Sequence, residues 1–150
     1  MAIVAARYHA EIVDALADGA RECFVAHNGA GSNLLQVVAP GAFELPVMSQ
    51  ALAARDDVDA VVCLGCVLTG ETSHDRYICD AVAHGLTRVG LDFGKPVAFG
   101  VLTCQTLAQA RARAGGDRGN KGEEAMLAAL QSLQAIRSIA AAPTAGGSTS

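Results

Sequence analysis

Tryptophan is absent from the chain, and aromatic residues of all kinds make up only 4% of its 150 positions. Basic residues are also scarce, since 11 Lys and Arg stand against 15 Asp and Glu, for a formal net charge of −4. Binding of nucleic acid needs a basic surface, so this balance argues against nucleic acid as a partner. The sequence has no apolar run of the roughly 18 residues that a membrane helix needs, and its first residues lack the pattern of a signal peptide. We therefore expect a cytoplasmic protein without nucleic-acid or membrane partners.

The cysteines are too few and too scattered for a disulfide framework, because there are five of them at irregular spacings. Cys63 and Cys66 have a C-x-x-C spacing, but they stand within "AVVCLGCVL", an apolar run that predicts a buried strand. Residues three apart in a strand point to opposite faces, so this pair could not share a metal ion or form an unstrained disulfide. We therefore expect no metal site, and cysteines that act as small buried hydrophobic side chains.

Hydrophobic residues make up 51% of the chain and follow two alternating patterns. Short apolar runs bounded by glycine, proline or polar clusters predict strands, and apolar residues three or four apart predict helices. The predicted strands cover residues 2–7, 33–39, 59–68 and 95–103. The predicted helices cover residues 10–27, 43–55, 73–94, 106–114 and 123–141, with a loop at 115–122. We expect one domain over residues 1–141 and a flexible tail at 142–150.

Four strands that alternate with helices predict a parallel sheet covered by helices on both faces. A sheet of this kind binds its ligands at the carboxyl ends of its strands. Polar or aromatic residues follow all four predicted strands, in the stretches "RYHAE", "APGAFE", "TGETSH" and "GVLTC". We expect these stretches to converge on one edge of the sheet.

His74 is the first candidate for chemistry, because a histidine can carry protons near neutral pH. It falls in the first turn of a predicted helix, where the positive end of the helix dipole disfavours the imidazolium cation. A neutral imidazole can accept a proton, as a general base must. The alternative is an ordinary surface or capping histidine. A triad of Ser73, His74 and Asp75 is excluded, because adjacent residues cannot orient one another as a triad requires.

The segment "TGETS", which precedes His74, is a candidate anion site. Free N–H groups at the start of a helix attract phosphate, and Gly70 permits a close approach of the backbone. The alternative is a plain helix cap by Thr72 or Ser73, and both interpretations can hold together. The sequence contains neither of the glycine motifs that bind nucleotides, so a nucleotide-binding loop has no support.

Three further features could either bind a ligand or serve the fold. The stretch "RAGGDRGNKGEE" suits a phosphate, unless it is a solvated turn between two helices. Phe43 and Glu44 could line a site, or they could fill the core and cap a helix. Tyr8 could stack on a planar ligand or simply pack. The basic residues of the glycine-rich stretch are Arg111, Arg113, Arg118 and Lys121.

Four motifs together resemble those of the lumazine synthase family of riboflavin biosynthesis. They are "VVAPGAFELP", "CLGCVLTGETSHDRY", "KPVAFGVLT" and "RAGGDRGNKG", and their order and spacing match the family from about Ile3 to Ile139. The resemblance implies a flavodoxin-like α/β three-layer sandwich, with a four-stranded parallel sheet covered by helices on both faces. It also implies assembly into homopentamers, which in some relatives form decamers or shells of sixty subunits.

The resemblance implies a reaction as well. In that family 5-amino-6-(D-ribitylamino)uracil condenses with 3,4-dihydroxy-2-butanone 4-phosphate to give 6,7-dimethyl-8-ribityllumazine, phosphate and water. No metal or organic cofactor is implied, and the product passes to riboflavin synthase. His74 would shuttle protons, Tyr8 would stack on the uracil ring, and Arg113 would clamp the phosphate. Phe99 would come from a neighbouring subunit, and Lys121 would reach the uracil oxygens.

The remaining residues implied by the resemblance would contact the substrates with side chains or backbone. Those lining the ribityl and pyrimidine site would be Ala42, Phe43 and Glu44, with the backbone of Cys66, Val67 and Leu68. Those holding the phosphate through their N–H groups would be Glu71 and Thr72.

The sequence departs from the family's usual pattern near the phosphate and at its start. Thr69 stands where the family usually has arginine, and Asp117, followed by Arg118, stands where many members have lysine. The sequence also begins at its first strand, whereas shell-forming relatives add an N-terminal strand to a neighbour's sheet. The compact turn "GGDRGNKG" matches the shell-forming relatives. We give the missing strand more weight and expect a bare pentamer as the active unit.

Three other classes of protein would share parts of this pattern. A pentameric carrier would bind riboflavin or lumazine without turnover, and a structural container would form shells without needing catalysis. A flavodoxin-type electron carrier has the same fold, but a fold alone does not establish a function. The histidine and the anion motif argue against the carrier, whereas imaging would reveal shells and a colourless purified protein would exclude the electron carrier.

Overall fold

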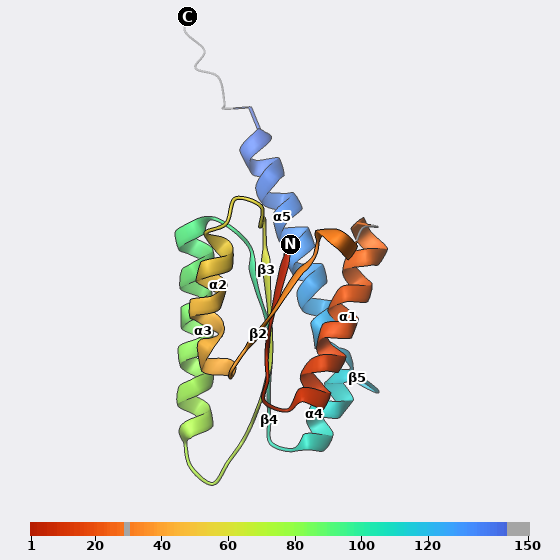
Figure 1. Cartoon of the computed structure of the whole chain (residues 1–150), viewed down its shortest axis with the longest axis vertical. Coiled ribbons are helices and arrows are strands. Elements are labelled where there is room, and N and C mark those ends of the chain that lie inside the picture. Colours follow the sequence, from red (N-terminus) through yellow and green to blue (C-terminus); the bar gives the residue numbers. More distant parts are fainter. Residues whose placement is uncertain (29–30, 144–150) are drawn as a thin grey trace, which may run out of the picture.

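A computed structural model describes residues 1–28 and 31–143 (Figure 1). Its main sheet is parallel, with four strands in the order β2-β1-β3-β4. The strands are β1 (Ala2–Ala6), β2 (Leu35–Ala39), β3 (Val61–Leu68) and β4 (Val97–Cys104). The helices are α1 (Ala10–Asn28), α2 (Leu45–Ala53), α3 (His74–Phe93), α4 (Leu107–Arg113) and α5 (Lys121–Ala141). The predicted flavodoxin-like α/β fold is therefore confirmed. Residues 144–150 of the predicted tail lie outside the described residues.

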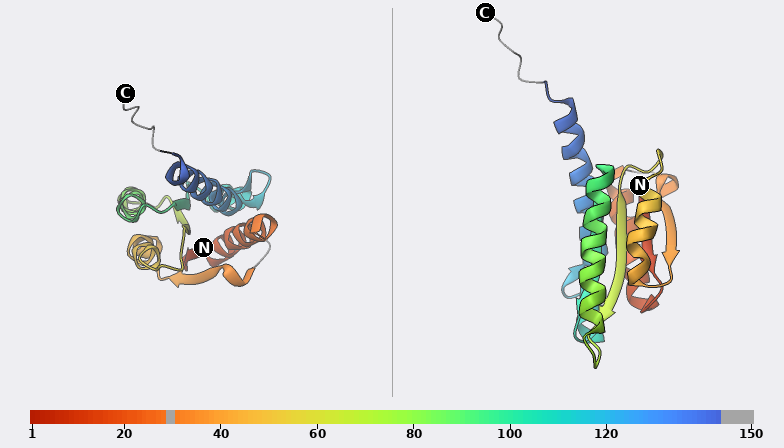
Figure 2. Two further views of the ribbon diagram at one scale, coloured as in Figure 1. Left: turned by 90° about the horizontal axis from the view of Figure 1, so that it is seen from above. Right: turned by 90° about the vertical axis from the view of Figure 1, so that its left-hand side faces the viewer.

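Helices cover both faces of the sheet and produce three layers, with α2 and α3 on one side and α1 and α5 on the other (Figure 2). Successive residues of β1 alternate between the two cores: Ile3 packs toward α1 and α5, and Val4 packs toward α2 and α3. All five residues of β1 are buried, as are Val61–Cys66 of β3. Central strands covered on both faces require such continuous apolar sequences, which is why the sequence pattern identified them.

The ends of the helices follow the local chemistry of the sequence. Gly94 ends α3 in the left-handed conformation with φ 60°, which glycine adopts without steric cost. Pro46 lies in the first turn of α2, where its missing N–H removes no helical hydrogen bond. Directly after Gly94, Lys95 Nζ donates to the carbonyls of Ala53 and Arg55 at the end of α2, both at 2.8 Å. This lysine connects the segment after α3 to the end of α2.

Several predicted boundaries are wrong. The stretch 115–122 is not a loop, because β5 (Ala114–Gly116) and β6 (Gly119–Asn120) pair antiparallel and α5 already begins at Lys121. Two short 3₁₀ turns, η1 (Gly31–Asn33) and η2 (Ala42–Glu44), delay the starts of β2 and α2 by two residues. The other ends either coincide with the prediction or differ from it by one or two residues. Elements this short bury too few side chains to leave a periodic pattern in the sequence.

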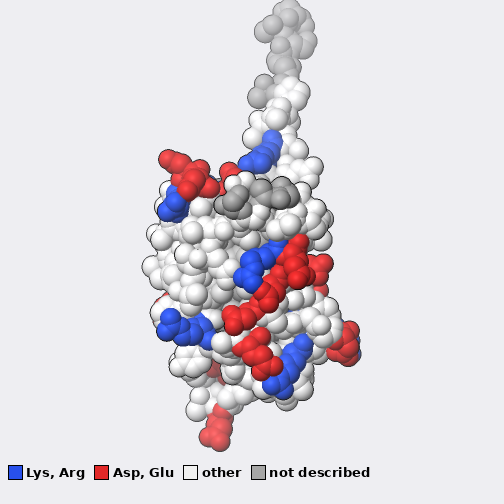
Figure 3. All heavy atoms as spheres, turned by 45° about the vertical axis from the view of Figure 1, so that its right-hand side comes forward, with Lys and Arg blue, Asp and Glu red and all other residues white. Residues whose placement is uncertain are grey.

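Acidic and basic side chains lie close together on the face that includes α1 (Figure 3). Two of the ion pairs of α1 are Asp18 with Arg21 and Glu11 with Arg111. The second pair joins α1 to α4, with distances of 3.1 and 3.2 Å from the guanidinium to the two carboxylate oxygens. Within residues 1–28 and 31–143, no helix has the combined length and apolarity that a membrane crossing requires.

Candidate active site

Three of the four strand exits line one cavity of about 470 Å³, which we call the His74 pocket. This size suits a small organic ligand. The exits are those of β1, β2 and β3, as the rule for open parallel sheets predicts. The residues that line the pocket are Tyr8, His9, Gly41, Ala42, Phe43, Glu44, Cys66, Val67, Leu68, Gly70, Thr72, His74, Asp75 and Ile78.

The turn between β1 and α1 presents Tyr8 and His9 to the pocket. His9 has φ 56°, a left-handed conformation that few residues other than glycine adopt. Its carbonyl accepts hydrogen bonds from the N–H groups of Ile12 and Val13, at 2.9 and 3.0 Å. These bonds start α1 immediately after the turn. Tyr8 is left 73% exposed at the pocket, so its ring is available to a ligand or a neighbouring chain.

The turn after β2 brings Glu44 back toward Tyr8. A Cβ atom at Gly41 would lie 3.0 Å from Glu44 Oε2 and 3.8 Å from the ring of Tyr8. The missing side chain of Gly41 therefore makes room for the carboxylate beside the aromatic ring. Phe43 lies in the same 3₁₀ turn and is 61% exposed. Two open aromatic rings and one carboxylate thus come together at the mouth of the pocket.

The end of β3 offers its backbone rather than its side chains. The central strand β1 pairs with β3 only as far as Leu64, whereas β4 pairs with β3 up to Leu68. The edge of β3 that β1 leaves uncovered faces the pocket at residues 66–68. Cys66 is 4% exposed, and its burial raises the pKa of its thiol to about 11. A neutral thiol is a poor nucleophile, so the backbone is the part of this segment able to recognise a ligand.

The predicted place of His74 is correct, because it is the first residue of α3 and is exposed at the pocket. Ser73 is the N-cap residue, but its side chain makes no capping hydrogen bond. Among the described residues, one side-chain oxygen reaches the first turn of α3: Thr72 Oγ1 accepts weakly from His74 N–H, at 3.4 Å. The helix start is therefore sparsely capped and can offer N–H groups to an anion. Glu71 is exposed in the same loop but does not line the pocket.

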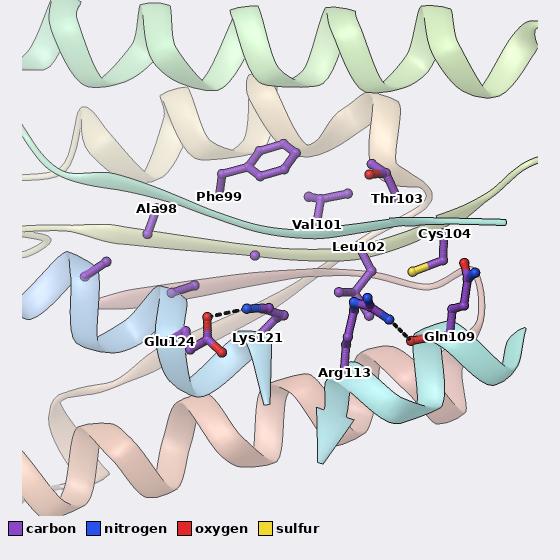
Figure 4. Close-up of a pocket in the computed structure, with 13 residues that line it drawn as sticks. Ala98, Phe99, Val101, Leu102, Thr103, Cys104, Gln109, Arg113, Lys121 and Glu124 are labelled. Carbon is purple, nitrogen blue, oxygen red and sulfur yellow. Dashed lines mark hydrogen bonds and ion pairs between the residues drawn. The ribbon is translucent and has the colours of Figure 1, made fainter. Parts of the chain in front are cut away.

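A second cavity, of about 560 Å³, lies along the edge strand β4, and we call it the Arg113 pocket (Figure 4). Arg113 Nη1 donates to the carbonyl of Gln109 at 3.1 Å, and Lys121 forms an ion pair with Glu124. Both basic side chains lie on one side of β4, while Phe99 points away on the other side (Figure 4). Phe99 is 45% exposed. This pocket therefore presents two basic side chains on one side of β4, and the open ring of Phe99 lies on the other side.

The other charged residues that the sequence singled out lie outside both pockets. Arg111 is occupied by its ion pair with Glu11. Asp117 and Arg118 form the exposed turn between β5 and β6. Thr69 donates its N–H to the carbonyl of Cys104 at 2.9 Å and lines neither pocket. Of the four basic residues that the sequence singled out here, two therefore line a cavity, Arg113 and Lys121.

Sequence reasoning did not select several residues that line the pockets, among them His9, Asp75, Gln109 and Glu124. The signal for His9 was available, because it is a titratable residue in the turn after the first strand. Asp75 was considered only as part of a triad. The backbone carbonyl of Gln109 accepts a hydrogen bond from Arg113. Any residue has such a carbonyl, so the type of residue at position 109 does not predict this contact.

The cysteines behave as the apolar run predicted. All five are free, and four of them are buried. Cys63 is hydrogen-bonded to Ser49 at 3.0 Å, and burial raises the pKa of its thiol to about 12. Among the residues that the structure describes, no three His, Cys, Asp or Glu side chains gather as a metal ion would require.

The fold and its cavities define a flavodoxin-like α/β protein with a pocket at the carboxyl ends of its parallel strands. Comparison with known proteins then identifies the family. The sequence profile described as 6,7-dimethyl-8-ribityllumazine synthase matches residues 1–137, and the chain belongs to that family.

Curated relatives with this name are similar over most of their length. One from Cytophaga hutchinsonii is 50% identical over 123 residues, which are 82% of this chain and 77% of the relative. One from Sulfurospirillum multivorans is 47% identical, covering 83% and 80% of the two chains. One from Aquifex aeolicus is 44% identical, covering 82% and 80%. Identity at this level over four fifths of the chain identifies an enzyme of the same family.

Proposed function

We propose that the chain is a transferase that condenses 5-amino-6-(D-ribitylamino)uracil with 3,4-dihydroxy-2-butanone 4-phosphate. The products are 6,7-dimethyl-8-ribityllumazine, phosphate and water, and the step is the one before riboflavin formation. Membership of the family supports the reaction. The roles of individual residues are assigned from the two pockets. One contains a histidine and two aromatic side chains, and the other contains two basic side chains.

The His74 pocket suits the ribitylaminouracil. Its uracil ring would stack on Tyr8, because a planar heterocycle gains from contact with an aromatic face. The uncovered edge of β3 at residues 66–68 offers backbone N–H and C=O groups to the ring's amide edge. Ala42, Phe43 and Glu44 would line the ribityl chain, with the Glu44 carboxylate accepting hydrogen bonds from its hydroxyl groups.

The phosphate of the butanone substrate would lie at the start of α3. The N–H groups of Glu71 and Thr72 would hold it there, together with the positive end of the helix dipole. Arg113 would add a guanidinium, which donates to two phosphate oxygens at once. A phosphate held between these groups is a leaving group whose charge is already stabilised.

His74 is the proton carrier of the proposed mechanism. The amino group of the uracil substrate attacks the ketone of the butanone phosphate, and His74 carries one proton from the nitrogen to the ketone oxygen as the carbinolamine forms. His74 then takes the second proton from the nitrogen and gives it to the hydroxyl group, which leaves as water and gives the imine. A second proton, removed from carbon, accompanies loss of phosphate. Ring closure and a second dehydration complete the product.

The division into two pockets supports a site shared between chains. Phe99, Arg113 and Lys121 line a different cavity from Phe43 and His74 of the same chain. Tyr8, Phe43 and Phe99 are open aromatic side chains, and large exposed apolar patches on a soluble protein usually mark contacts. The proposed enzyme is therefore a homopentamer in which the Arg113 pocket of one chain closes the His74 pocket of the next.

The wider setting is part of the same proposal. The enzyme works in the cytoplasm, as one domain over residues 1–141, and passes its product to riboflavin synthase. No metal or organic cofactor takes part, because proton transfer and anion binding suffice for each step.

The proposed function is tested by mixing the purified full chain with both substrates and following lumazine absorbance. We expect turnover that needs both substrates and releases one phosphate per lumazine. Binding of lumazine or riboflavin without turnover would instead identify a carrier. A purified protein that is yellow and can be reduced reversibly would point to an electron carrier of the same fold.

A further inference from the structure

Asn120 makes three hydrogen bonds that connect α5 to α1. Its Oδ1 accepts from the N–H groups of Gly122 and Glu123, at 2.8 and 3.2 Å, and so caps the start of α5. Its Nδ2 donates to the carbonyl of Ala15 in α1, at 2.9 Å. An amide is the neutral side chain that can both accept and donate in this way. Asn120 therefore fixes the first turn of α5 against α1.

Two glycines allow α1 and the start of α5 to approach each other unusually closely at Asn120. A Cβ atom at Gly19 of α1 would lie 2.4 Å from Asn120 Cγ, so the side chain of Asn120 occupies the space of a missing methyl group. A Cβ atom at Gly122 of α5 would collide with the carbonyl of Leu16. The two helices approach each other here through backbone atoms. The position of the start of α5 is therefore tightly determined.

Lys121 follows Asn120 directly and is the first residue of α5. It lines the Arg113 pocket, and its Nζ pairs with Glu124 on the same helix turn (Figure 4). The ammonium group sits on the first turn of the helix that Asn120 caps and ties down. If that turn shifts or frays, Lys121 moves with it. Arg113 should stay in place, because α4 is held by its own hydrogen bonds.

We propose that Asn120 is a positioning residue for Lys121, acting through the cap of α5 and the contact with Ala15. This inference rests on the proposed function, together with the contact of Lys121 with the uracil oxygens that the family resemblance implies. Asn120 itself has no contact with substrate in this arrangement. Its contribution is to hold the ammonium group of Lys121 in position to contact the uracil ring of ribitylaminouracil.

The test uses steady-state kinetics of the full chain with both substrates. We expect Asn120→Ala to raise the KM for ribitylaminouracil roughly 10-fold, less than the about 100-fold that a 1 Å misplacement can cost. The KM for the butanone phosphate should change much less. A direct role of Asn120 on the phosphate would reverse this order and overturn the inference.

A double-mutant cycle separates positioning from general structural damage. If Asn120 acts through Lys121, its substitution in a Lys121→Ala background should leave the KM for ribitylaminouracil unchanged. Independent effects would multiply instead. Multiplied effects would therefore overturn the inference, even if Asn120→Ala alone weakened the substrate.

Two further variants test the same contact in case Asn120→Ala does not fold. Gly19→Ala adds a methyl group against the Asn120 amide and should raise the same KM, although alanine favours a helix more than glycine does. Asn120→Ser can still cap α5 but is too short to reach Ala15, so it should retain part of the defect. No change in KM for either folded variant would contradict the proposed contact.

Lys95→Met is the matched control, because Lys95 also connects two elements by donating to backbone carbonyls. It lies just before the amino-terminal end of β4 and lines neither pocket. This variant should lose thermal stability without a selective change in KM. The same KM change in Lys95→Met would mean that Asn120 acts through stability alone. A wild-type chain without turnover would overturn the proposed function itself, before any variant is compared.

Discussion

His74 combines the residue type of a proton carrier with a position at the start of a helix and at the edge of a cavity. We expect His74→Ala to lower kcat by roughly 10²–10⁴-fold, the usual contribution of general acid–base catalysis, with little change in KM. Steady-state turnover measures both constants. His84→Ala is the control, because His84 is exposed on the same helix and its Nδ1 is bonded to the carbonyl of Asp80. Equal losses in the two variants would remove His74 from the mechanism.

Arg113 and Arg111 stand two residues apart but have different surroundings. Arg113 lines a cavity, whereas Arg111 is bound to Glu11. We expect Arg113→Ala to weaken the butanone phosphate by about 1.5–3 kcal/mol, or roughly 10- to 100-fold in KM, because it removes a charge-assisted contact. Arg111→Ala should have a much smaller effect on the same constant. The reverse order would show that the wrong arginine has been assigned to the phosphate.

The kinds of residue in the site could be predicted from the sequence, because ligands of parallel sheets bind where the strands end. His74, Tyr8 and Phe43 follow strands, and all three line one pocket. Their separation from Phe99 and Arg113 could not be read from residue patterns. The separation depends on how β4 and α4 are placed in the fold and on whether a neighbouring chain faces them.

At the scale of elements, the ion pair between Glu11 and Arg111 connects α1 to α4. The hydrogen bond with Arg111, aided by its charge, lowers the pKa of Glu11 below its ordinary value of 4.5. A carboxylate whose pKa is lower in the folded state stabilises the fold above pH 4.5. That stabilisation is lost as the pH falls through the lowered value. The contribution is small, because both side chains are exposed.

Thermal unfolding of Glu11→Gln tests this link. We expect Tm to fall slightly relative to wild type at neutral pH, and the difference to disappear as the pH drops below the lowered pKa. Glu22→Gln on the same helix is the control, because Glu22 takes part in none of the ion pairs found among the described residues. A difference from wild type that persists in acid would mean that the amide disturbs α1 in some other way.

Hydrophobic patterning predicted the longer elements because each buries a continuous face. The strand β1 is buried throughout and β3 over Val61–Cys66, and α1 buries Ile12, Val13 and Leu16. The hairpin of β5 and β6 escaped prediction for the opposite reason. Its register is held by backbone pairing and by Asn120, whereas its glycines bury no side chain.

For the whole molecule, the shared site predicts complementation between two inactive variants. In a mixture of His74→Ala and Arg113→Ala chains, an intact site forms where a normal His74 meets a normal Arg113 of the next chain. Random assembly of equal amounts in a closed ring should make about a quarter of the sites intact. Mixing after reversible dissociation, followed by the turnover assay, measures this recovery. A mixture no more active than its separate components would place both residues in the same chain's site.

Assembly itself is measured by light scattering on active protein. We expect the mass of five chains, because the open aromatic residues at both pockets need neighbours to cover them. A mass near that of one chain would contradict the shared site. A mass near that of sixty chains would show that pentamers associate further.

The separation of the His74 pocket from the Arg113 pocket has a consequence for how the protein responds to its substrates. If the proposed shared site is correct, substrates that touch both pockets bind the assembled ring more tightly than the single chain. By mass action they would then draw free chains into rings, so that part of the free energy of binding stabilises the contacts between subunits. In a dilute solution, the chains would assemble into rings when the substrates are added, and the rings would dissociate again as the substrates are consumed.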